Sequence, residues 1–331
     1  MSTESSFTAE LLKLDCDKET QKITDTVRNV VLKRLRKRGV VVALSGGIDS
    51  SVVGALCVRA LGKERVLGLL MPEKDSSERT SDLGRLITDH LGILTVHEDI
   101  TGILEAVGCY RRRDEAVRSV VPEYGPGYKC KIVLPNVTDN DRYRIFSVVV
   151  QSPGDKQIKV RLKPNSYLGI VAATNFKQRT RKMLEYYHAD RLNYAVTGTP
   201  NRQEYDQGFF VKLGDGAADV KPIAHLYKTQ VYQMAEFLGI PDEIRNRPPM
   251  TDTYPMQQSQ EEFYFSVPYD KMDLCLYGKN HGVSTEEVAV VADMTAEQVE
   301  RVYRDIDAKR KATRYLHTPP VLIDRVDEIS Y

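Results

Sequence analysis

The stretch V-V-V-A-L-S-G-G-I-D-S-S-V-V-G-A-L-C, residues 40–57, decides the fold of this chain. Residues 40–44 are apolar and mostly β-branched, which is typical of a buried strand. Ser45-Gly46-Gly47 supplies small residues for a sharp turn, and the sequence continues from Ser50 with helical apolar spacing. A strand, a glycine turn and a helix N-terminus form an anion site, because free backbone N–H groups and the positive end of the helix dipole converge on the turn.

Asp49 indicates which anion this turn binds. A carboxylate in a phosphate-binding turn repels phosphate unless a cation lies between them, so Asp49 predicts a Mg²⁺ ion that bridges to the phosphates of a nucleotide. The turn is not a Walker A loop, since the sequence contains no G-x-x-x-x-G-K-[ST] motif. A plain glycine turn is the simpler alternative, but six specified positions between a strand and a helix favour the phosphate site.

The composition sets limits on the protein's class. With 331 residues, 41% hydrophobic and 28% charged, the chain is typical of a globular protein in water. Its 47 Lys and Arg balance 46 Asp and Glu, so nothing favours nucleic acid or membrane as a partner. We expect neither a secretory signal nor a membrane span, because no apolar run is long enough. Five scattered cysteines without a C-x-x-C pair favour the reducing cytoplasm and argue against a zinc site.

Strands and helices alternate along most of the sequence. Further strands are predicted at 65–72, 94–98 and 192–196, with helices around 83–91, 100–117, 167–188 and 227–238, and the last third is helical at 283–293 and 295–308. This alternation predicts an α/β fold, a doubly wound parallel sheet with helices on both faces. We divide the chain into an N-terminal helical lead-in at 1–38 and an α/β domain at 39–331. Ligands of such sheets bind at the carboxyl ends of the strands, where Asp49 lies.

An insertion at about 122–164 interrupts the alternation. Alternating stretches at 130–134, 143–151 and 157–162, with turns at 136–141 and 153–155, predict a three-stranded antiparallel meander. Its role stays open among a lid, a dimer contact, an element that shapes the substrate site and a surface elaboration.

The second half of the sequence contains further charged residues that are candidates for the site. Glu204 comes in a loop directly after a strand, as Asp49 does, so the two carboxylates could share a Mg²⁺ ion. Lys212 and Lys228 could offer point charges to phosphate. In N-F-K-Q-R-T-R, residues 175–181, a lysine and an arginine four positions apart share one helix face. Taken singly, each of these residues could equally belong to a solvated surface.

Together these segments resemble the ammonia-dependent NAD synthetases, a family of ATP pyrophosphatases. That family combines S-G-G-x-D-S with N-x-K-x-R-x-R and then G-T-x-x-x-x-E-x-x-x-G-[YF]-F-x-K-x-G-D-G-x-x-D-x-x-P-[IL]-x-x-L-x-K. This chain keeps all three segments with their spacing, the third running from Gly198 to Lys228. The resemblance covers about 30–108 and 166–310.

The resemblance implies a reaction and a set of site residues. The family adenylates the nicotinate carboxylate of deamido-NAD with ATP and Mg²⁺, and ammonia then displaces AMP to give the amide. ATP would contact Ser45, Gly46, Gly47, Ile48, Asp49, Ser50, Thr199 and Lys228; the metal ligands would be Asp49 and Glu204; the acyl substrate would face Asn175, Arg181, Lys212 and Asp219; and the catalytic residues would be Asp49, Asp219, Lys228 and Thr251. Members are typically homodimers with the substrate site near the subunit interface. No glutaminase domain is present in the sequence, so ammonia would be free or come from another chain.

The sequence also departs from the family pattern. Met250 stands where the family's ATP-contacting loop has a hydroxyl, with Thr251 one place late, and the family's C-terminal H-K-R-x-x-P is only loosely echoed at 314–319. Two alternatives therefore stay open: the same adenylation and amidation of another carboxylic acid, and a non-catalytic paralogue that binds nucleotide. Retention of Asp49, Glu204 and Lys228 together favours catalysis. Sulfur transfer to tRNA is disfavoured, because the sequence has neither paired cysteines nor a basic surplus.

Overall fold

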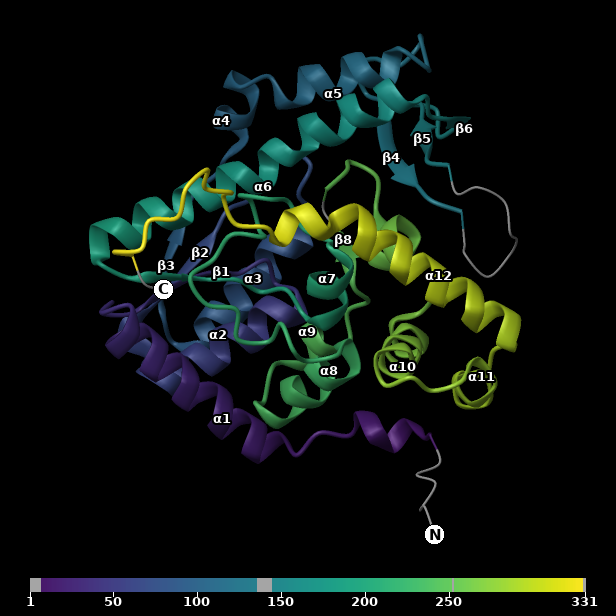
Figure 1. Ribbon diagram of the computed structural model, residues 1–331. Helices are drawn as coiled ribbons and strands as arrows, with labels where there is room; N and C mark the ends of the chain where they lie inside the picture. Colours follow the sequence, from purple (N-terminus) through teal and green to yellow (C-terminus); the bar gives the residue numbers. More distant parts are fainter. Residues whose placement is uncertain (1–6, 136–144, 252, 330–331) are drawn as a thin grey trace.

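A four-stranded parallel sheet lies at the centre of the molecule (Figure 1). The computed structural model describes residues 7–135, 145–251 and 253–329. In the order β3-β2-β1-β7, the strands of this sheet are β3 (Leu94–His97), β2 (Val66–Leu70), β1 (Val40–Ala43) and β7 (Ala195–Thr197). The predicted parallel sheet is thus confirmed, and the predicted phosphate turn follows the central strand β1 directly.

Helices cover both faces of this sheet. Successive side chains of β1 point to opposite faces and are apolar, so each face has to be buried against helices. Val40 and Val42 pack into one apolar cluster with α1 (Cys16–Asn29), α2 (Ile48–Leu61), α3 (Glu78–Leu91) and α8 (Lys228–Phe237). Val41 packs into a second cluster with α4 (Thr101–Ala106), α5 (Cys109–Arg118) and α6 (Pro164–Leu192). The predicted doubly wound arrangement, with helices on each face, is therefore confirmed.

Two predicted boundaries differ from the structure. The helix predicted at 100–117 is two helices, α4 and α5, because the chain turns at Gly108, whose φ is 71°. The strand predicted at 192–196 starts at Ala195, since α6 continues to Leu192 and ends at Asn193 in the left-handed region.

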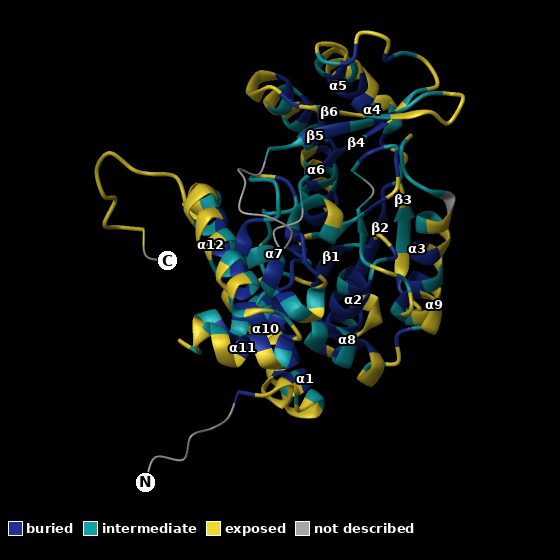
Figure 2. Cartoon of the chain, turned by 90° about the vertical axis from the view of Figure 1, so that its right-hand side faces the viewer, coloured by how far each residue is buried: buried dark blue, intermediate teal, exposed yellow. Residues whose placement is uncertain are grey.

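The predicted meander is present as a separate antiparallel sheet. Its strands are β4 (Lys129–Val133), β5 (Ser147–Gln151) and β6 (Gln157–Arg161), in that spatial order. Figure 2 shows this sheet beside α5 and one end of α6, and Val117 of α5 and Ile170 of α6 share its apolar cluster. The turn predicted at 136–141 lies outside the described residues.

The last third of the chain is helical, as predicted. The helices α10 (Tyr269–Asn280), α11 (Thr285–Ala292) and α12 (Ala296–Thr313) enclose a core of their own. Ser284 and Thr295 cap the last two of these helices, each accepting a hydrogen bond from a backbone N–H three residues on. Shorter helices, α7 (Arg202–Gln207) and α9 (Asp242–Arg245), lie between β7 and this region of the sequence.

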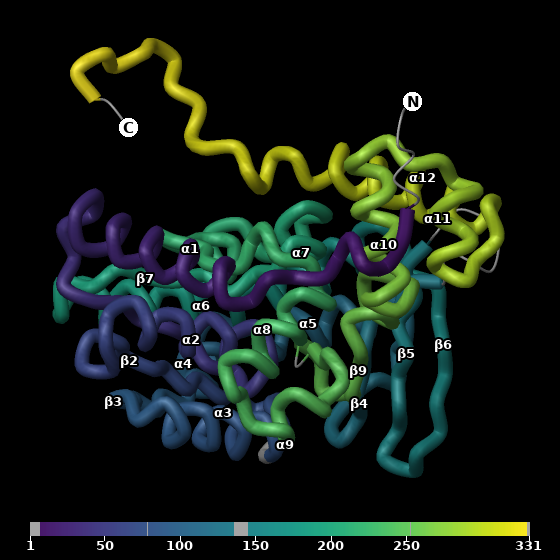
Figure 3. The backbone as a smooth tube through the Cα atoms, turned by 90° about the horizontal axis from the view of Figure 1, so that it is seen from below, coloured from purple at the N-terminus to yellow at the C-terminus, as the bar shows by residue number. Residues whose placement is uncertain are grey.

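Beyond the short helix η5 (Arg314–His317), which follows α12, the chain leaves the body of the molecule, as Figure 3 shows from below, and the apolar side chains of Val321, Leu322 and Ile323 are exposed. Among the described residues, the structure contains no helix with the length and apolar character that a membrane crossing requires.

Candidate active site

A cavity of about 460 Å³ opens at the carboxyl ends of the parallel strands. Its wall includes the ends of β1, β2 and β7, the turn that follows β1, one face of α6 and the segment 247–260. Open α/β sheets bind their ligands at this edge. The cavity is therefore the candidate active site.

The turn after β1 has the geometry of an anion site. Gly46 has a φ of 70°, and a Cβ there would lie 2.6 Å from Cβ of Leu83 and 2.8 Å from the backbone nitrogen of Gly84, so only glycine fits. Ser50 Oγ donates to the carbonyl of Gly47 at 3.0 Å and holds the turn against the first turn of α2. No side chain caps this helix, whose N-cap is Gly47, so its N-terminal N–H groups face the cavity without a side-chain partner.

Asp49, Glu204 and Lys228 meet in this cavity. Lys228, the first residue of α8, is only 2% exposed, and its Nζ donates to Oδ2 of Asp49. The other oxygen of Asp49 accepts from Nδ2 of Asn201 at 3.0 Å, and the backbone N–H of Asn201 donates to Oε2 of Glu204 at 3.1 Å. Glu204 Oε1 accepts from Nε2 of Gln260 at 3.0 Å. Two carboxylates and one ammonium group thus face the phosphate turn.

Burial controls the ionisation of this cluster. It raises the pKa of Glu204 to about 8, and the negative charge of Asp49 acts in the same direction. Burial alone would lower the pKa of Lys228, but the carboxylates of Asp49 and Glu204 outweigh it and raise that pKa overall. Lys228 therefore stays positively charged, whereas a nearby cation would favour the ionised form of Glu204.

The two carboxylates fit a magnesium ion better than a metal held by protein alone. The residues that the structure describes contain no group of three or more His, Cys, Asp or Glu side chains able to hold a metal. Mg²⁺ is usually held by one or two carboxylates together with substrate phosphates and waters. Asp49 and Glu204 share Asn201 as a hydrogen-bond partner and border the phosphate turn. This donor set suits an ion that arrives with a nucleotide.

Most of the predicted site residues line the cavity: Ser45, Gly47, Ile48, Asp49, Ser50, Asn175, Arg181, Thr199, Glu204, Lys228 and Thr251. The described part of the wall does not include Gly46, Lys212 or Asp219. Lys212 Nζ donates to the carbonyls of Tyr315 and Thr318, at 2.7 and 3.0 Å. Asp219 accepts from the backbone N–H of Val196 at 2.7 Å and is exposed. The substrate roles of Lys212 and Asp219 stay predictions.

Two residues of this site were not predicted from the sequence. Asn201 links Asp49 to Glu204, and its signal was the spacing N-x-x-E of a capping box at the start of α7. Gln260 had no comparable signal, and for Lys177 the pattern predicted the helix face but not its burial. The 175–181 segment predicted a shared helix face, but the Lys177 side chain is 1% exposed and bonded to carboxylates, whereas Arg181 Nε donates to the carbonyl of Met71 at 3.2 Å.

Comparison with known proteins finds a matching family and highly similar relatives. A family model described as NAD synthase matches residues 19–121 and 145–315. The chain is 61% identical to an NH₃-dependent NAD⁺ synthetase of Mesorhizobium japonicum, over 96% of this chain and 100% of that protein. It is 60% identical to the protein of the same name from Rhizobium meliloti, over 98% and 96% of the two chains.

Solved structures share the fold at lower identity. The NH₃-dependent NAD synthetase from Campylobacter jejuni superimposes with a TM-score of 0.61 at 22% identity, covering 94% of this chain and 100% of that one. An NMN synthetase from Francisella tularensis gives a TM-score of 0.65 at 21% identity, covering 95% and 100%. At these identities the likeness concerns the fold alone.

Proposed function

Because this chain belongs to the NAD synthase family, we propose that it is an ammonia-dependent ligase that converts deamido-NAD to NAD with ATP, releasing AMP and pyrophosphate. The observation that carries this proposal is the meeting of Asp49, Glu204 and Lys228 beside the glycine turn after β1. This arrangement supplies what adenylation of a carboxylate needs: a phosphate cradle, a fixed positive charge and two oxygen ligands for a cation.

The first step activates the acid. A carboxylate oxygen of deamido-NAD attacks the α-phosphorus of ATP, the bond to the β-phosphate oxygen breaks, and pyrophosphate leaves. The N-terminal N–H groups of α2 hold phosphate oxygens at the turn 45–50. Lys228 lies beside this turn as a buried ammonium group, so its charge opposes the negative charge that grows on the leaving pyrophosphate.

Asp49 and Glu204 would hold the Mg²⁺ ion in this proposal. When bound, the ion supplies charge neutralisation of the phosphate oxygens. Its positive charge would also favour the ionised form of the Glu204 carboxyl, whose pKa is raised in its absence.

The second step forms the amide. Ammonia attacks the acyl carbon of the adenylate, AMP leaves with the electrons of the acyl–oxygen bond, and the surplus proton goes to solvent or a nearby base. Asn175 and Arg181 line the cavity from α6 and would orient the acyl group. Thr199 and Thr251 line the nucleotide side and would contact ATP.

The proposal includes a homodimer and a reducing compartment, the cytoplasm. The usual assembly of the family supports the dimer. All five cysteines are free, which suits a reducing environment.

The test is pyrophosphate release with ATP, Mg²⁺ and ammonium, measured with and without deamido-NAD while NAD is followed. We expect release that depends on deamido-NAD and equals the NAD formed. Stimulation by nicotinate mononucleotide alone would show that the acid is wrong. Tight ATP binding with no turnover on either acid would support a non-catalytic paralogue.

A further inference from the structure

One wall of the cavity is a hairpin segment, residues 247–263, which we call the covering hairpin; its residue 252 lies outside the described part. Its strands β8 (Met250–Thr251) and β9 (Gln258–Ser259) pair antiparallel. Arg247, Thr251, Thr253 and Gln260 of this segment line the cavity. Its conformation therefore determines how closed the nucleotide site is.

The inserted meander holds the covering hairpin along the edge of β4. Because β4 is an edge strand, with β5 on one side only, its other side is open for pairing. Gln258 Nε2 donates to the carbonyl of Ile132 at 2.5 Å, and the backbone N–H of Met256 donates to the carbonyl of Cys130 at 3.4 Å. These two carbonyls lie two residues apart, so they point to the same side of the strand.

A charged pair and two rings strengthen this contact. Lys131 of β4 forms an ion pair with Glu262 at 2.7 Å, and its Nζ also donates to the carbonyl of Gln257 at 3.3 Å. Tyr254, which is 3% exposed, packs in the apolar cluster of the meander, and its ring meets that of Phe263 edge to face at 5.6 Å. The covering hairpin thus shares a core with the insertion.

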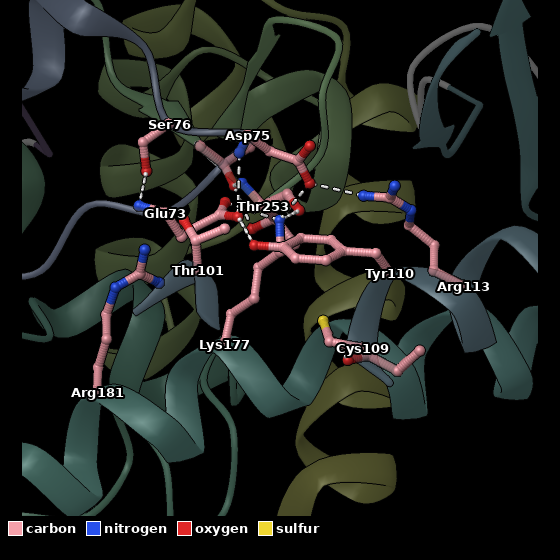
Figure 4. A network of polar contacts seen from close by, with 12 residues as sticks. Glu73, Asp75, Ser76, Thr101, Cys109, Tyr110, Arg113, Lys177, Arg181 and Thr253 are labelled. Atoms are coloured by element: carbon pink, nitrogen blue, oxygen red, sulfur yellow. Dashed lines mark hydrogen bonds and ion pairs between the residues drawn. The ribbon is translucent and has the colours of Figure 1, made fainter. Parts of the chain in front are cut away.

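Lys177 fixes the covering hairpin from the other side (Figure 4). Its Nζ donates to the carbonyl of Thr253 at 2.9 Å, to Oε1 of Glu73 at 2.9 Å and to Oδ2 of Asp75 at 2.7 Å. Glu73 and Asp75 belong to the loop that follows β2. Arg113 of α5 shares the same oxygen of Asp75 at 2.6 Å. One ammonium group therefore ties together α6, this loop and the hairpin.

The charges at the centre of this network are out of water, while a partly exposed carboxylate, Asp114, also pairs with Arg113 at 2.9 Å. Two carboxylates, Glu73 and Asp75, face two cations, Lys177 and Arg113, and each of the four side chains is at most 7% exposed. Tyr110 donates to the second oxygen of Glu73 at 2.7 Å. Removing one partner from such a network leaves a buried charge uncompensated, so the network disfavours arrangements that separate these groups.

The covering hairpin also reaches the catalytic carboxylates, through the bond from Gln260 to Glu204 described above. Contacts therefore run without interruption from the meander, through the hairpin, to the metal side of the site.

We propose that the inserted meander is the support that keeps the covering hairpin closed over the adenylate, with Lys131, Gln258 and Lys177 as positioning residues. This proposal rests on the function proposed above. An acyl adenylate that meets water instead of ammonia returns the free acid and AMP, because water attacks the acyl carbon, AMP leaves and a proton is released. A closed hairpin keeps water out, so its support determines how much AMP is formed for each NAD.

The test uses the full-length chain with Lys131→Ala and Gln258→Leu, alone and combined. The control is Lys159→Ala, which removes an exposed lysine of the same sheet, from β6. Hydrogen–deuterium exchange of the peptide covering 247–263 reports the position of the hairpin without any substrate. The ratio of AMP to NAD formed reports the loss of adenylate to water.

We expect the amides of the hairpin to exchange about twofold to tenfold faster in each single variant, the change that loss of one hydrogen bond allows. The ratio of AMP to NAD should rise above one and the KM for ATP should increase, whereas Lys159→Ala should match the wild type. Unchanged exchange in the combined variant would overturn the proposal. Faster exchange with a ratio still at one would overturn the role in excluding water.

Lys177→Met is a second, stronger perturbation. We expect it to lower the melting temperature as well, because it leaves the buried Glu73 carboxylate without its cationic partner and Asp75 with Arg113, so the variants at 131 and 258 provide the cleaner test of support by the meander. If the wild type made no NAD but exchange still responded to those variants, the proposed substrate would be wrong and the support by the meander would stand.

Discussion

Replacing Lys228 with methionine tests the charge arrangement of the site most directly. The lysine is 2% exposed and its ammonium group is the cationic partner of Asp49. Without it, the Asp49 carboxylate keeps the amide of Asn201 as its hydrogen-bond partner among the described residues, next to the half-buried Glu204. Breaking a buried ion pair in this way lowers the free energy of unfolding by about 3–5 kcal/mol. Loss of a preorganised charge at the reacting phosphates slows the reaction by about 10²–10³-fold.

Two assays separate these effects. Urea unfolding followed by circular dichroism measures stability, and pyrophosphate release, at a temperature where the variant is folded, measures the rate. The double variant Lys228→Met with Asp49→Asn should regain part of the stability, because it removes the unpaired carboxylate, while remaining inactive. A folded Lys228→Met enzyme within about threefold of the wild-type kcat/KM, far from the loss expected for such a charge, would refute the reasoning. Additive stability losses in the double variant would refute the ion pair.

Three further predictions concern the same site and its supports. Asp49→Asn should reduce pyrophosphate release by about 100-fold or more and should also lower the melting temperature, because it leaves the buried ammonium group of Lys228 without its carboxylate partner; a rate near wild type, measured where the variant is folded, would contradict the assigned Mg²⁺ ligand. Gly46→Ala should destabilise the protein by more than the positive-φ strain of about 1–2 kcal/mol, since its Cβ would lie 2.6 Å from Cβ of Leu83, whereas Gly282→Ala, with the same φ of 70° and nothing within 4 Å, lacks this contact; equal losses in urea unfolding would show that the close contact is unimportant. Burial raises the pKa of Asp273 to about 6 from its ordinary 3.8. Between about pH 4 and 6 the folded state therefore holds a proton that the unfolded state has lost. As the pH rises through this range, the free energy of unfolding falls by up to about 3 kcal/mol. Asp273→Asn should remove that pH dependence, and an unchanged profile of urea unfolding against pH would show that another group causes it.

The fold was largely predictable because its decisive signals are local. A β-branched run, two glycines and an apolar helix lie within residues 40–57, and the same alternation recurs along the chain. The two element boundaries that were predicted wrongly each depend on the backbone conformation of one residue. Gly108 and Asn193 end one element and start another by adopting positive φ, and neither lies in an obvious turn sequence.

The site was predictable only where it follows the strands. Asp49 and Glu204 come directly after strands, so topology brings them to one edge of the sheet. The position of Lys177 had no such signal, because α6 is covered on more than one side. Its buried residues include Lys177, Lys182, Glu185 and His188, so no apolar stripe distinguishes the inward face from the outward one. Polar burial of this kind is decided by partners far away in the sequence.

The meander shows the same limit of prediction from sequence. It also connects two departures from the family pattern, the insertion itself and the altered loop at Met250. The alternation of apolar and polar residues predicted its three strands. It could not predict which edge of the sheet meets the covering hairpin, because Lys131 and Glu262, which form an ion pair across that edge, are separated by 131 positions. The hairpin paired with this edge begins in the segment 247–253, where Met250 replaces the family's hydroxyl, and Met250 itself pairs with Ser259 in β8–β9. This loop is held by the inserted sheet through the bonds of Gln258, Met256 and Gln257 to β4. The altered loop and the insertion therefore form one structural unit, and a change in either is expected to alter the closure of the site.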